Sequence, residues 1–520
     1  MRAGKGAATA LAWLWLFAPL VFMWPTSRSA VDAAASAALL ACCLLWRPSM
    51  RVAAAVLWLI GLAHLAYFLA VDSLPDEYFW FTVFGSSLGE AWEYVTSYRR
   101  SDALRLAWWL LPASLALHWL WSRAGALRGR WRWLGLLSLL LWLAWSLVSC
   151  AKGNGVAGSL SKVDRVYPAA FAESYLRYRQ SSAHMFAVPP APEPAAPPLA
   201  DVVVMVIGES ASAQRWSLLG YRGNPTNAAL APLGDSLVAL PVQANGNNTA
   251  QTVPLLLTGQ QVEPVPEGGV LTYLDKAAKA GFKVVTLSNQ SSFGAGQSFF
   301  FTAFRQRSSQ YRPLQAGQWD GALTPLVAQA LEDTPPAGRL MLTVHMYGSH
   351  PRVEGRVPPG AALWADAYDN SIAYTSALLA DWVAQLSRLQ DRRVVLIYVS
   401  DHGLAFPACG GSYVHGSTRS AYEVPLMLWG NARFRADNAA WWQQWQARAR
   451  QAVAPDGRLQ FTNLLVPFAL DDLLGMSPVS TLVPAGPALP SSAAYPPPAD
   501  ERQCERFTPY DVAAALKQRR

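Results

Sequence analysis

Two adjacent pairs of residues in this chain carry the side chains of a metal-dependent nucleophilic site. Glu209 is followed by Ser210, and Asp401 is followed by His402. Carboxylate oxygens and imidazole nitrogens are common ligands of Zn²⁺, so the three ionisable side chains could hold one ion with the hydroxyl as a fourth ligand. Metal contact would lower the pKa of that hydroxyl and make Ser210 a nucleophile. The alternative is that Ser210 and Asp401 are ordinary caps and that His402 is a surface histidine.

Each pair follows an apolar run that predicts a buried strand. Val202–Ile207 precedes the first pair, and residues 394–399 precede the second. Unbroken apolar runs rich in β-branched residues are typical of parallel strands that are buried on both faces. Ligands of such sheets gather at the carboxyl ends of the strands. The sequence from Ala211 onward predicts a helix, whose N-terminus would favour an anion such as a phosphoryl group.

Three blocks around these residues resemble the signature blocks of the membrane-bound phosphoethanolamine transferases, a family of the alkaline phosphatase and sulfatase superfamily. The blocks are residues 208–210, 217–221 and 400–403. The resemblance implies that Ser210 is the catalytic nucleophile, although many relatives have threonine at this position. It also implies one tight zinc site, with the ligands Glu209, Ser210, Asp401 and His402.

The resemblance extends to three residues that are expected to bind substrate. Thr249 matches a threonine that contacts the phosphoryl group, and a helix cap is its other possible and compatible role. His350 and His415 match two accessory histidines that bind the transferred group or a second, weaker zinc ion. For both histidines the alternative is a structural role with satisfied hydrogen bonds.

Three further positions carry weaker expectations. Glu90 lies in residues 86–91, which resemble the segment between the family's third and fourth membrane helices that helps to form the lipid site. The alternative for this segment is an amphipathic helix on the membrane surface. His345 ends a predicted strand, where its imidazole could simply bond to backbone. Residues 368–371 open a helix that matches a family block and is expected to give structural support.

The composition indicates a membrane protein. The chain has 520 residues, of which 52% are hydrophobic and 15% charged, and many of its 23 tryptophans lie near residues 13–146. The net charge of +8 does not indicate nucleic-acid binding, because much of it lies in short loops between apolar segments. Of the five cysteines, Cys409 and Cys504 could form a disulfide in an exported domain.

Five segments have the length and apolar composition of membrane helices. They are residues 7–24, 30–46, 52–71, 103–121 and 133–151, and the first could instead be a signal peptide. With the N-terminus in the cytoplasm, the eight basic residues of the inner flanks are Arg2, Lys5, Arg47, Arg51, Arg123, Arg128, Arg130 and Arg132. The four of the outer flanks are Arg28, Arg99, Arg100 and Lys152. Because basic residues concentrate in cytoplasmic loops, everything after about residue 152 is expected to lie outside the cytoplasm.

The chain is expected to form a transmembrane α-helical bundle of about five helices followed by an α/β domain of the sulfatase and alkaline phosphatase type. The predicted boundaries are residues 1–151 for the membrane domain, 152–200 for a bridge and 201–520 for the catalytic domain. The bridge contains a predicted interfacial helix, 167–179, and the Pro-rich residues 189–198, which are typical of an extended linker.

Strands and helices alternate after residue 201, which predicts a mostly parallel central sheet. The predicted strands are residues 202–207, 282–287, 340–344, 394–399 and 424–429. Polar residues follow several of these strands, including 288–290 and 345–350. One active-site rim would produce this pattern.

The family resemblance implies zinc-dependent transfer of phosphoethanolamine from phosphatidylethanolamine, through an ester on Ser210, to lipid A or lipopolysaccharide core. The enzyme would be a monomer in the bacterial inner membrane with its catalytic domain in the periplasm. Ser212 and Gln214 stand where a formylglycine sulfatase needs Pro and Arg, and the chain has no phosphate-binding P-loop for a nucleotide donor. The alternatives are a membrane-anchored phosphodiesterase, a phosphoglycerol or phosphoethanolamine transferase acting on a periplasmic glycan, and a non-catalytic scaffold.

Overall fold

The computed structural model of the chain describes most of its two compact units. The described residues are 2–19, 43–71, 75, 77–85, 92, 100–122, 132–133, 135–138, 140, 144, 169–260, 265–290, 299–315, 317–407, 413–455 and 459–476. One unit comprises residues 1–80 and 98–180, and the other comprises residues 81–97 and 181–520.

The described helices and strands are as follows. The helices of the first part of the chain are α1 (Arg2–Leu16), α4 (Arg47–Val71), α5 (Glu77–Gly85), α7 (Arg100–Ser122) and α10 (Ala169–His184). The later helices are α11 (Thr249–Thr258), α12 (Tyr273–Lys279), α13 (Phe299–Arg307), α14 (Thr324–Glu332), α15 (Ala367–Leu386), α16 (Arg419–Tyr422), α17 (Ala432–Asp437), α18 (Ala439–Gln451) and α19 (Leu465–Leu473). The strands are β1 (Val202–Gly208), β2 (Leu237–Gln243), β3 (Phe282–Ser288), β4 (Gln310–Pro313), β5 (Arg339–His345), β6 (Val394–Ser400) and β7 (Glu423–Gly430).

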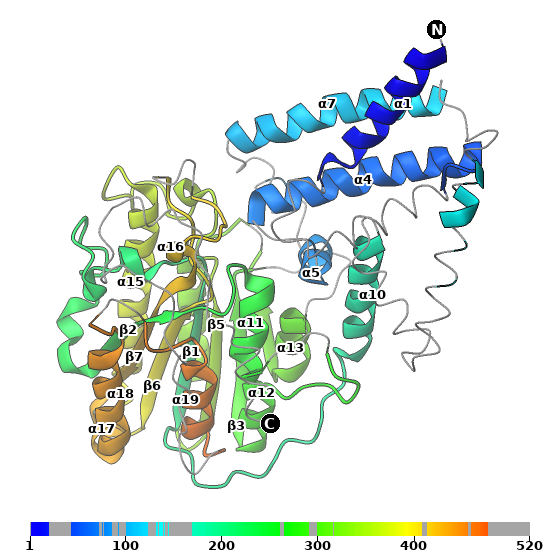
Figure 1. Cartoon of the computed structure of the whole chain (residues 1–520). Helices are drawn as coiled ribbons and strands as arrows, with labels where there is room; N and C mark the ends of the chain where they lie inside the picture. Colours follow the sequence, from blue (N-terminus) through cyan, green and yellow to red (C-terminus); the bar gives the residue numbers. More distant parts are fainter. Residues whose placement is uncertain are drawn as a thin grey trace. The chain divides into compact units, whose positions relative to one another are not determined.

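The larger unit is built on one seven-stranded sheet with the order β2-β7-β6-β1-β5-β3-β4 (Figure 1). Strand β1 pairs in parallel with β5 and β6, and β3 pairs in parallel with β5 and β4. Only the pairings of β7, with β6 and with β2, are antiparallel among the described strands. The predicted α/β domain with a mostly parallel sheet is therefore confirmed.

All five predicted strands form, and two further strands were not predicted. Each of the five has apolar residues on both faces, and every residue of β1 is buried. The sequence of β2 was missed because Pro241 interrupts it, and proline is tolerated here because β2 lies at the edge of the sheet. The other edge strand, β4, has only four residues, none of them buried, so it has no apolar signal.

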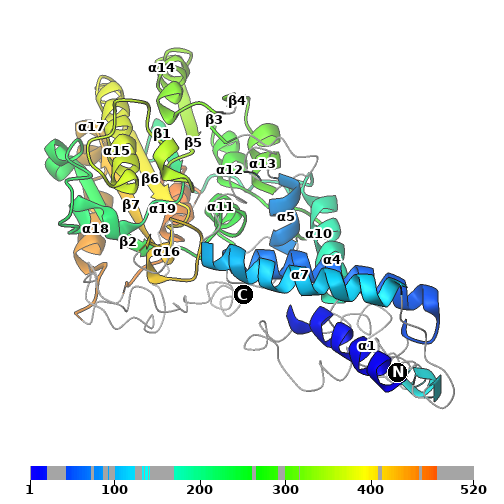
Figure 2. The same cartoon turned by 90° about the horizontal axis from the view of Figure 1, so that it is seen from above.

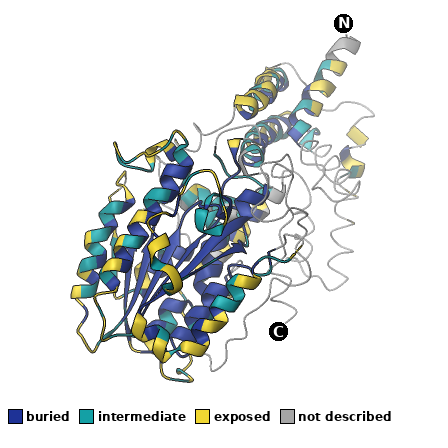
Figure 3. Ribbon diagram, turned by 90° about the vertical axis from the view of Figure 1, so that its left-hand side faces the viewer, coloured by how far each residue is buried: buried dark blue, intermediate teal, exposed yellow. Residues whose placement is uncertain are grey.

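Helices cover both faces of the sheet. Helices α14, α15 and α17 lie on one face, while α11, α12, α13 and α19 lie on the other (Figure 2). The strands between them are buried, and the exposed residues of the helices point outward (Figure 3). Val204 and Val206 of β1 belong to the same core cluster as Tyr368 and Ile372 of α15, so this helix and the strand that leads to Ser210 share one core.

A buried ion pair joins the helices on the second face. Arg307 of α13 lies 2.8 Å from Asp275 of α12, and their side chains are 2% and 11% exposed. Arg307 also donates to the carbonyl oxygen of Val270, at 2.6 Å. Asp275 in turn completes a capping box with Thr272 at the start of α12, so one carboxylate serves two helices.

The Pro-rich bridge is extended, as predicted, and it is bonded to the end of the sheet domain. Its residues between Val188 and Ala200 form no helix or strand. The amides of Ala195 and Ala196 donate to the carbonyl oxygen of Gly475, at 2.8 and 3.1 Å. The amide of Leu199 donates to Leu473. This segment is therefore held against the residues that follow α19.

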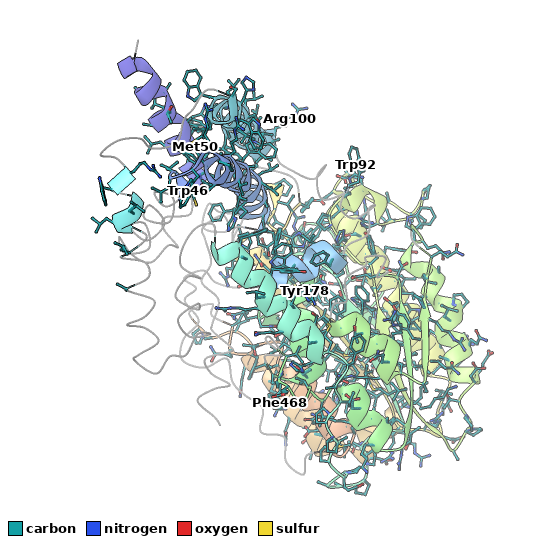
Figure 4. The ribbon with its side chains drawn as sticks, turned by 90° about the vertical axis from the view of Figure 1, so that its right-hand side faces the viewer. Trp46, Met50, Trp92, Arg100, Tyr178 and Phe468 are labelled. Atoms are coloured by element: carbon teal, nitrogen blue, oxygen red, sulfur yellow. The ribbon has the colours of Figure 1, made fainter. Side chains whose placement is uncertain are left out.

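In the other unit, α1 and α4 both pack against α7. Trp13, Leu16 and Met50 are buried with Trp109 in one apolar cluster. Met50 is 1% exposed, whereas Trp46, just before α4, is 54% exposed (Figure 4). Large apolar side chains also point away from the cluster, including Leu59 at 61% and Leu115 at 71% exposure. An apolar outer face of this kind suits contact with lipid.

One helix among the described residues, within α4 at Arg47–Leu69, is long and apolar enough to cross a membrane. The predicted spans at residues 7–24 and 103–121 fall on α1 and α7, which are not long and apolar enough by this measure. Those at residues 30–46 and 133–151 lie mostly outside the described residues, so the predicted count of about five is not reproduced. The predicted interfacial helix at residues 167–179 corresponds to α10. Its Ser174 accepts a hydrogen bond from the indole of Trp80 in α5, and Phe171 packs against the same indole.

Candidate active site

The turn after β1 places the hydroxyl of Ser210 at the carboxyl end of the sheet. Ser210 has a φ of 59°, a left-handed conformation that costs about 1–2 kcal/mol for a residue with a side chain. Three successive amides hold the turn: those of Ser210, Ala211 and Ser212 donate to Asp401 Oδ1, Ser400 Oγ and the Tyr368 hydroxyl, respectively. The strained backbone is therefore fixed by side chains from β6, the turn after it and α15.

The helix predicted from Ala211 onward does not form, so this prediction was wrong. Two short 3₁₀ turns, η3 (Ala213–Arg215) and η4 (Ser217–Leu219), replace it. Trp216 between them is extended because its indole is fully buried and stacks on Tyr398 of β6, with the ring centroids 5.4 Å apart. Ser212 caps η3, because its side chain accepts a hydrogen bond from the amide of Gln214. The expected helix N-terminus is absent, and the three amides of the turn donate within the protein.

Glu209, Asp401 and His402 converge on one buried point. Their ligand atoms lie within 4.8 Å of one another, and none of the three residues is more than 1% exposed. His402 Nε2 lies 3.3 Å from Glu209 Oε1 and 3.5 Å from Asp401 Oδ2. The Ser210 hydroxyl donates to the same Glu209 oxygen at 2.5 Å. The structure thus brings the four residues predicted as metal ligands into one cluster.

The charges of this cluster are strongly coupled. Burial and the Glu209 carboxylate raise the pKa of Asp401 to about 7. Burial alone would lower the pKa of His402, but Asp401 and Glu209 raise it to about 9. Burial also opposes ionisation of Glu209, yet His402 holds the pKa of Glu209 well below its usual range. Two carboxylates that lie close together in a buried site repel each other, so a bound cation would stabilise both.

The residues present fit a zinc ion. Two carboxylates, one imidazole and one hydroxyl form a nitrogen and oxygen donor set that Zn²⁺ accepts. Asp401 Oδ2 is buried and accepts no hydrogen bond from the described part of the chain. His402 Nδ1 lies 2.8 Å from the carbonyl oxygen of Gly403. Donation to that carbonyl places the proton on Nδ1 and leaves the Nε2 lone pair free for a metal.

Thr249 lies beside this cluster, as predicted. Its hydroxyl donates to Glu209 Oε2 at 3.0 Å and lies 3.5 Å from His402 Nε2. It is the first residue of α11, and the cap is Asn248, whose side chain accepts from the amide of Gln251. The capping alternative for Thr249 was therefore wrong.

Gln290 is a site residue that sequence reasoning did not single out. Its side-chain amide donates to Glu209 Oε2 at 2.9 Å and to the carbonyl oxygen of Met346 at 2.9 Å. The sequence feature that could have identified Gln290 is its place in the polar run 288–290, directly after a predicted strand. Gln290 and Thr249 both bond Glu209 Oε2, which leaves Oε1 for Ser210 and His402.

His350 and His415 lie on the rim near His402. The His415 ring is 4.9 Å from that of His402 and 6.4 Å from that of His350. Arg356 approaches His350 Nδ1 at 3.4 Å and donates to the carbonyl oxygen of the same residue at 3.0 Å. Because a guanidinium group only donates, Nδ1 is the acceptor in this contact. Burial and the nearby His402 lower the pKa of His415 to about 3, so this ring is neutral at physiological pH.

The loop that carries His350 is held by Asp320. The carboxylate of Asp320 accepts from the amides of Tyr347 and Gly348, each at 2.8 Å, and from the side chain of Asn289. Gly348 has a φ of 50°, and a Cβ on it would lie 2.6 Å from the carbonyl oxygen of Glu209. This close approach keeps the loop against the residue before the nucleophile.

His345 is buried behind the cluster. Its Nδ1 lies 3.3 Å from the hydroxyl of Ser288, and its Nε2 has no hydrogen-bond partner among the described residues. The suggested bond to backbone is thus not found. Two predictions about other residues cannot be placed, because Glu90 and the cysteines Cys409 and Cys504 lie outside the described residues.

Comparison with known proteins places this site in a family. Residues 201–455 match the family model described as Sulfatase. The chain is 32% identical over 244 residues to the putative transferase YhbX of Escherichia coli K12, which covers 44% of this chain and 43% of that protein. The matched region is therefore less than half of YhbX. The chain is also 25% identical over 434 residues to the phosphoethanolamine transferase EptC of the same strain, which covers 73% of this chain and 74% of EptC.

A solved structure matches almost the whole chain. The integral membrane protein lipooligosaccharide phosphoethanolamine transferase A (EptA) of Neisseria meningitidis aligns with 90% of this chain and 95% of its own, with a TM-score of 0.60. At 17% identity this likeness shows a shared fold, including the N-terminal region. Residues 201–455 are therefore a sulfatase-like domain, and the chain is an enzyme homologous to proteins named phosphoethanolamine transferases.

Proposed function

We propose that this enzyme transfers phosphoethanolamine from phosphatidylethanolamine to an envelope glycolipid, lipid A or the core of lipopolysaccharide. The observation that carries the proposal is the Ser210 hydroxyl, which is buried 2.5 Å from Glu209 Oε1 in a cluster with Asp401 and His402. The names of EptC and EptA support the transferred group, and EptA, as a lipooligosaccharide phosphoethanolamine transferase, supports a glycolipid acceptor of that kind. We place the enzyme in the bacterial inner membrane with its catalytic domain in the periplasm.

The chain would hold one tightly bound zinc ion through Glu209, Ser210, Asp401 and His402. When bound, the ion stabilises the serine alkoxide and neutralises charge on the phosphoryl group. The His415 ring lies 4.9 Å from that of His402, the His350 ring lies beside His415, and Thr249 bonds Glu209 Oε2. We therefore assign His350, His415 and Thr249 to the transferred phosphoryl group.

Ser210 carries the transferred group between two displacements. Its Oγ attacks the phosphorus of the donor, and the bond from phosphorus to the diacylglycerol oxygen breaks as the new ester forms. The hydroxyl proton is already directed at Glu209 Oε1, and the diacylglycerol oxygen takes up a proton as it leaves. The acceptor oxygen then attacks the same phosphorus, the bond from phosphorus to Ser210 Oγ breaks, and the proton released by the acceptor returns to Oγ.

The deciding experiment is peptide mass spectrometry of the full chain incubated with phosphatidylethanolamine and no acceptor. The expected result is one phosphoethanolamine group on Ser210, which is absent in Ser210→Ala. Ser217→Ala is the matched control, because its hydroxyl bonds the amide of Asn227 away from the cluster. Modification of Ser212, or undiminished transfer by Ser210→Ala, would overturn the mechanism.

The acceptor is tested separately in cells. Mass spectrometry of lipid A, core oligosaccharide and periplasmic glucans, with and without the gene, should show a gene-dependent phosphoethanolamine on one of the first two. A gene-dependent group found only on the glucans would refute the acceptor while leaving the enzymatic step intact.

A further inference from the structure

The nucleophile is held in a backbone conformation that a serine does not adopt by itself. Ser210 is one of two non-glycine residues with positive φ among those that the structure describes, the other being Arg352. Left-handed backbone at such a residue persists only where its surroundings enforce it. Asp401 and Ser400 fix the amides of Ser210 and Ala211, but neither binds the Ser210 carbonyl.

The carbonyl side of the turn is held by Tyr368. Its hydroxyl donates to the carbonyl oxygen of Ser210 at 2.6 Å and accepts from the amide of Ser212 at 2.8 Å. A phenol can do both at once, because it has one proton and two lone pairs. The hydroxyl therefore closes a bridge between the residues on either side of Ala211, directly after the nucleophile.

Tyr368 is itself rigidly placed. It is fully buried in the first turn of α15, which Asp366 caps by accepting from the amides of Tyr368 and Asp369. Its ring stacks on Tyr413 with the centroids 4.6 Å apart, and the Tyr413 hydroxyl is bonded to the same Asp366 carboxylate. The bridge is thus anchored in a long helix that packs on the sheet.

We infer that Tyr368 is a positioning residue that sets the direction of the Ser210 hydroxyl towards the donor phosphorus. Without the phenol oxygen, the Ser210 carbonyl and the Ser212 amide lose a shared buried partner, and the turn can relax towards ordinary backbone. Relaxation would rotate Oγ away from the line of attack while leaving Glu209, Asp401 and His402 in place. A small misplacement of a reacting atom lowers the rate of the chemical step far more than it weakens substrate binding. The predicted loss of rate rests on the proposed function.

The test is Tyr368→Phe in the full-length, detergent-solubilised enzyme, with release of diacylglycerol from tail-labelled fluorescent phosphatidylethanolamine as the readout. We expect kcat to fall about 10- to 100-fold, with KM within about twofold and with unchanged zinc content. The matched control is Tyr273→Phe, which removes an equally buried hydroxyl, bonded to Thr343 at 2.9 Å beneath the sheet. This control should retain the kcat of the unmodified enzyme. A kcat for Tyr368→Phe equal to that of the control would overturn the inference, and so would a loss carried by KM alone.

A second variant tests the strain directly. A β-branched side chain fits positive φ less well than serine does, so Ser210→Thr should depend more heavily on the bridge. Tyr368→Phe should therefore cost at least threefold more in kcat in the Ser210→Thr background than in the original one. Equal costs in both backgrounds would contradict a role in holding the turn.

A measurement that needs no activity separates this inference from the proposed function. Hydrogen exchange at the Ser212 amide, followed by mass spectrometry of peptides spanning residues 209–213, should be about tenfold or more faster in Tyr368→Phe than in Tyr273→Phe. Unchanged exchange would overturn the inference. If the unmodified enzyme releases no diacylglycerol, the proposed function fails, while faster exchange in Tyr368→Phe would still support the positioning of the turn.

Discussion

Replacing Gly348 by alanine should damage the site through the backbone of Glu209. A Cβ at this position would lie 2.6 Å from the carbonyl oxygen, 2.9 Å from the nitrogen and 3.1 Å from the Cβ of Glu209. The φ of 50° adds a second penalty, because an L-residue in left-handed backbone costs about 1–2 kcal/mol. The overlap adds about 1–3 kcal/mol, typical of an overpacked interior, so the free energy of unfolding should fall by about 2–5 kcal/mol.

The matched control is Gly360→Ala. Gly360 has a φ of 83°, but a Cβ there would meet nothing within 4 Å, so this variant carries the backbone penalty alone, about 1–2 kcal/mol. Thermal unfolding of the two purified variants should place Gly348→Ala below Gly360→Ala by about 2–4 °C for each kcal/mol of difference. Gly348→Ala should also lose transfer activity and bind zinc less tightly, because the added Cβ would overlap the backbone of Glu209 and displace this residue. Identical melting and activity in the two variants would refute the argument from close approach.

Three further predictions concern burial and charge. Arg307→Ala should lower the free energy of unfolding in urea by about 3–5 kcal/mol, because it leaves the buried carboxylate of Asp275 without its ion-pair partner. The control Arg433→Ala removes a half-exposed ion pair and should lower it by less than about 1 kcal/mol. Equal losses in the two variants would contradict this prediction. Burial lowers the pKa of His345 to about 4. As the pH falls, the unfolded chain therefore protonates this histidine before the folded chain does. The free energy of unfolding should fall by about 1.4 kcal/mol per pH unit from about pH 6.5 towards 4. His345→Gln should unfold with a shallower pH dependence over that range, and an unchanged slope would count against the prediction. His402→Ala should lose zinc in metal analysis of the purified protein while His184→Ala, in α10, keeps it; unchanged zinc in His402→Ala would show that the ligand assignment is wrong.

The strands that position the site could be predicted because their burial is uniform. Strands such as β1 and β6 are covered on both faces, so nearly every residue is apolar and the signal is continuous. The edge strand β4 lacks this signal, and in the other edge strand, β2, Pro241 argued against a strand even though its neighbours are apolar. The helix predicted after Ser210 does not form, for a different reason. Its local sequence suits a helix, but burial of Trp216 against Tyr398 requires extended backbone there.

The site itself was predictable where its members adjoin one another in sequence. Glu209 with Ser210 and Asp401 with His402 each follow a recognisable strand, and parallel strands bring their carboxyl ends together. Tyr368 and Asp320 each bond two backbone groups that are far away in sequence. Tyrosine and aspartate near a helix start are common, so their residue types alone carried no indication of these partners.

The bonds between the bridge and Gly475 mean that the described part of the sheet domain begins and ends at the same place. The amides of Ala195 and Ala196 donate to the carbonyl oxygen of Gly475, so residue 195 and the last described residues of this domain are neighbours. A short loop joining residue 476 to residue 195 would therefore close the polypeptide without crossing the fold, and new termini could be opened elsewhere on the surface. Circular permutation of this kind would yield a sheet domain whose assembly can be studied independently of the N-terminal helices.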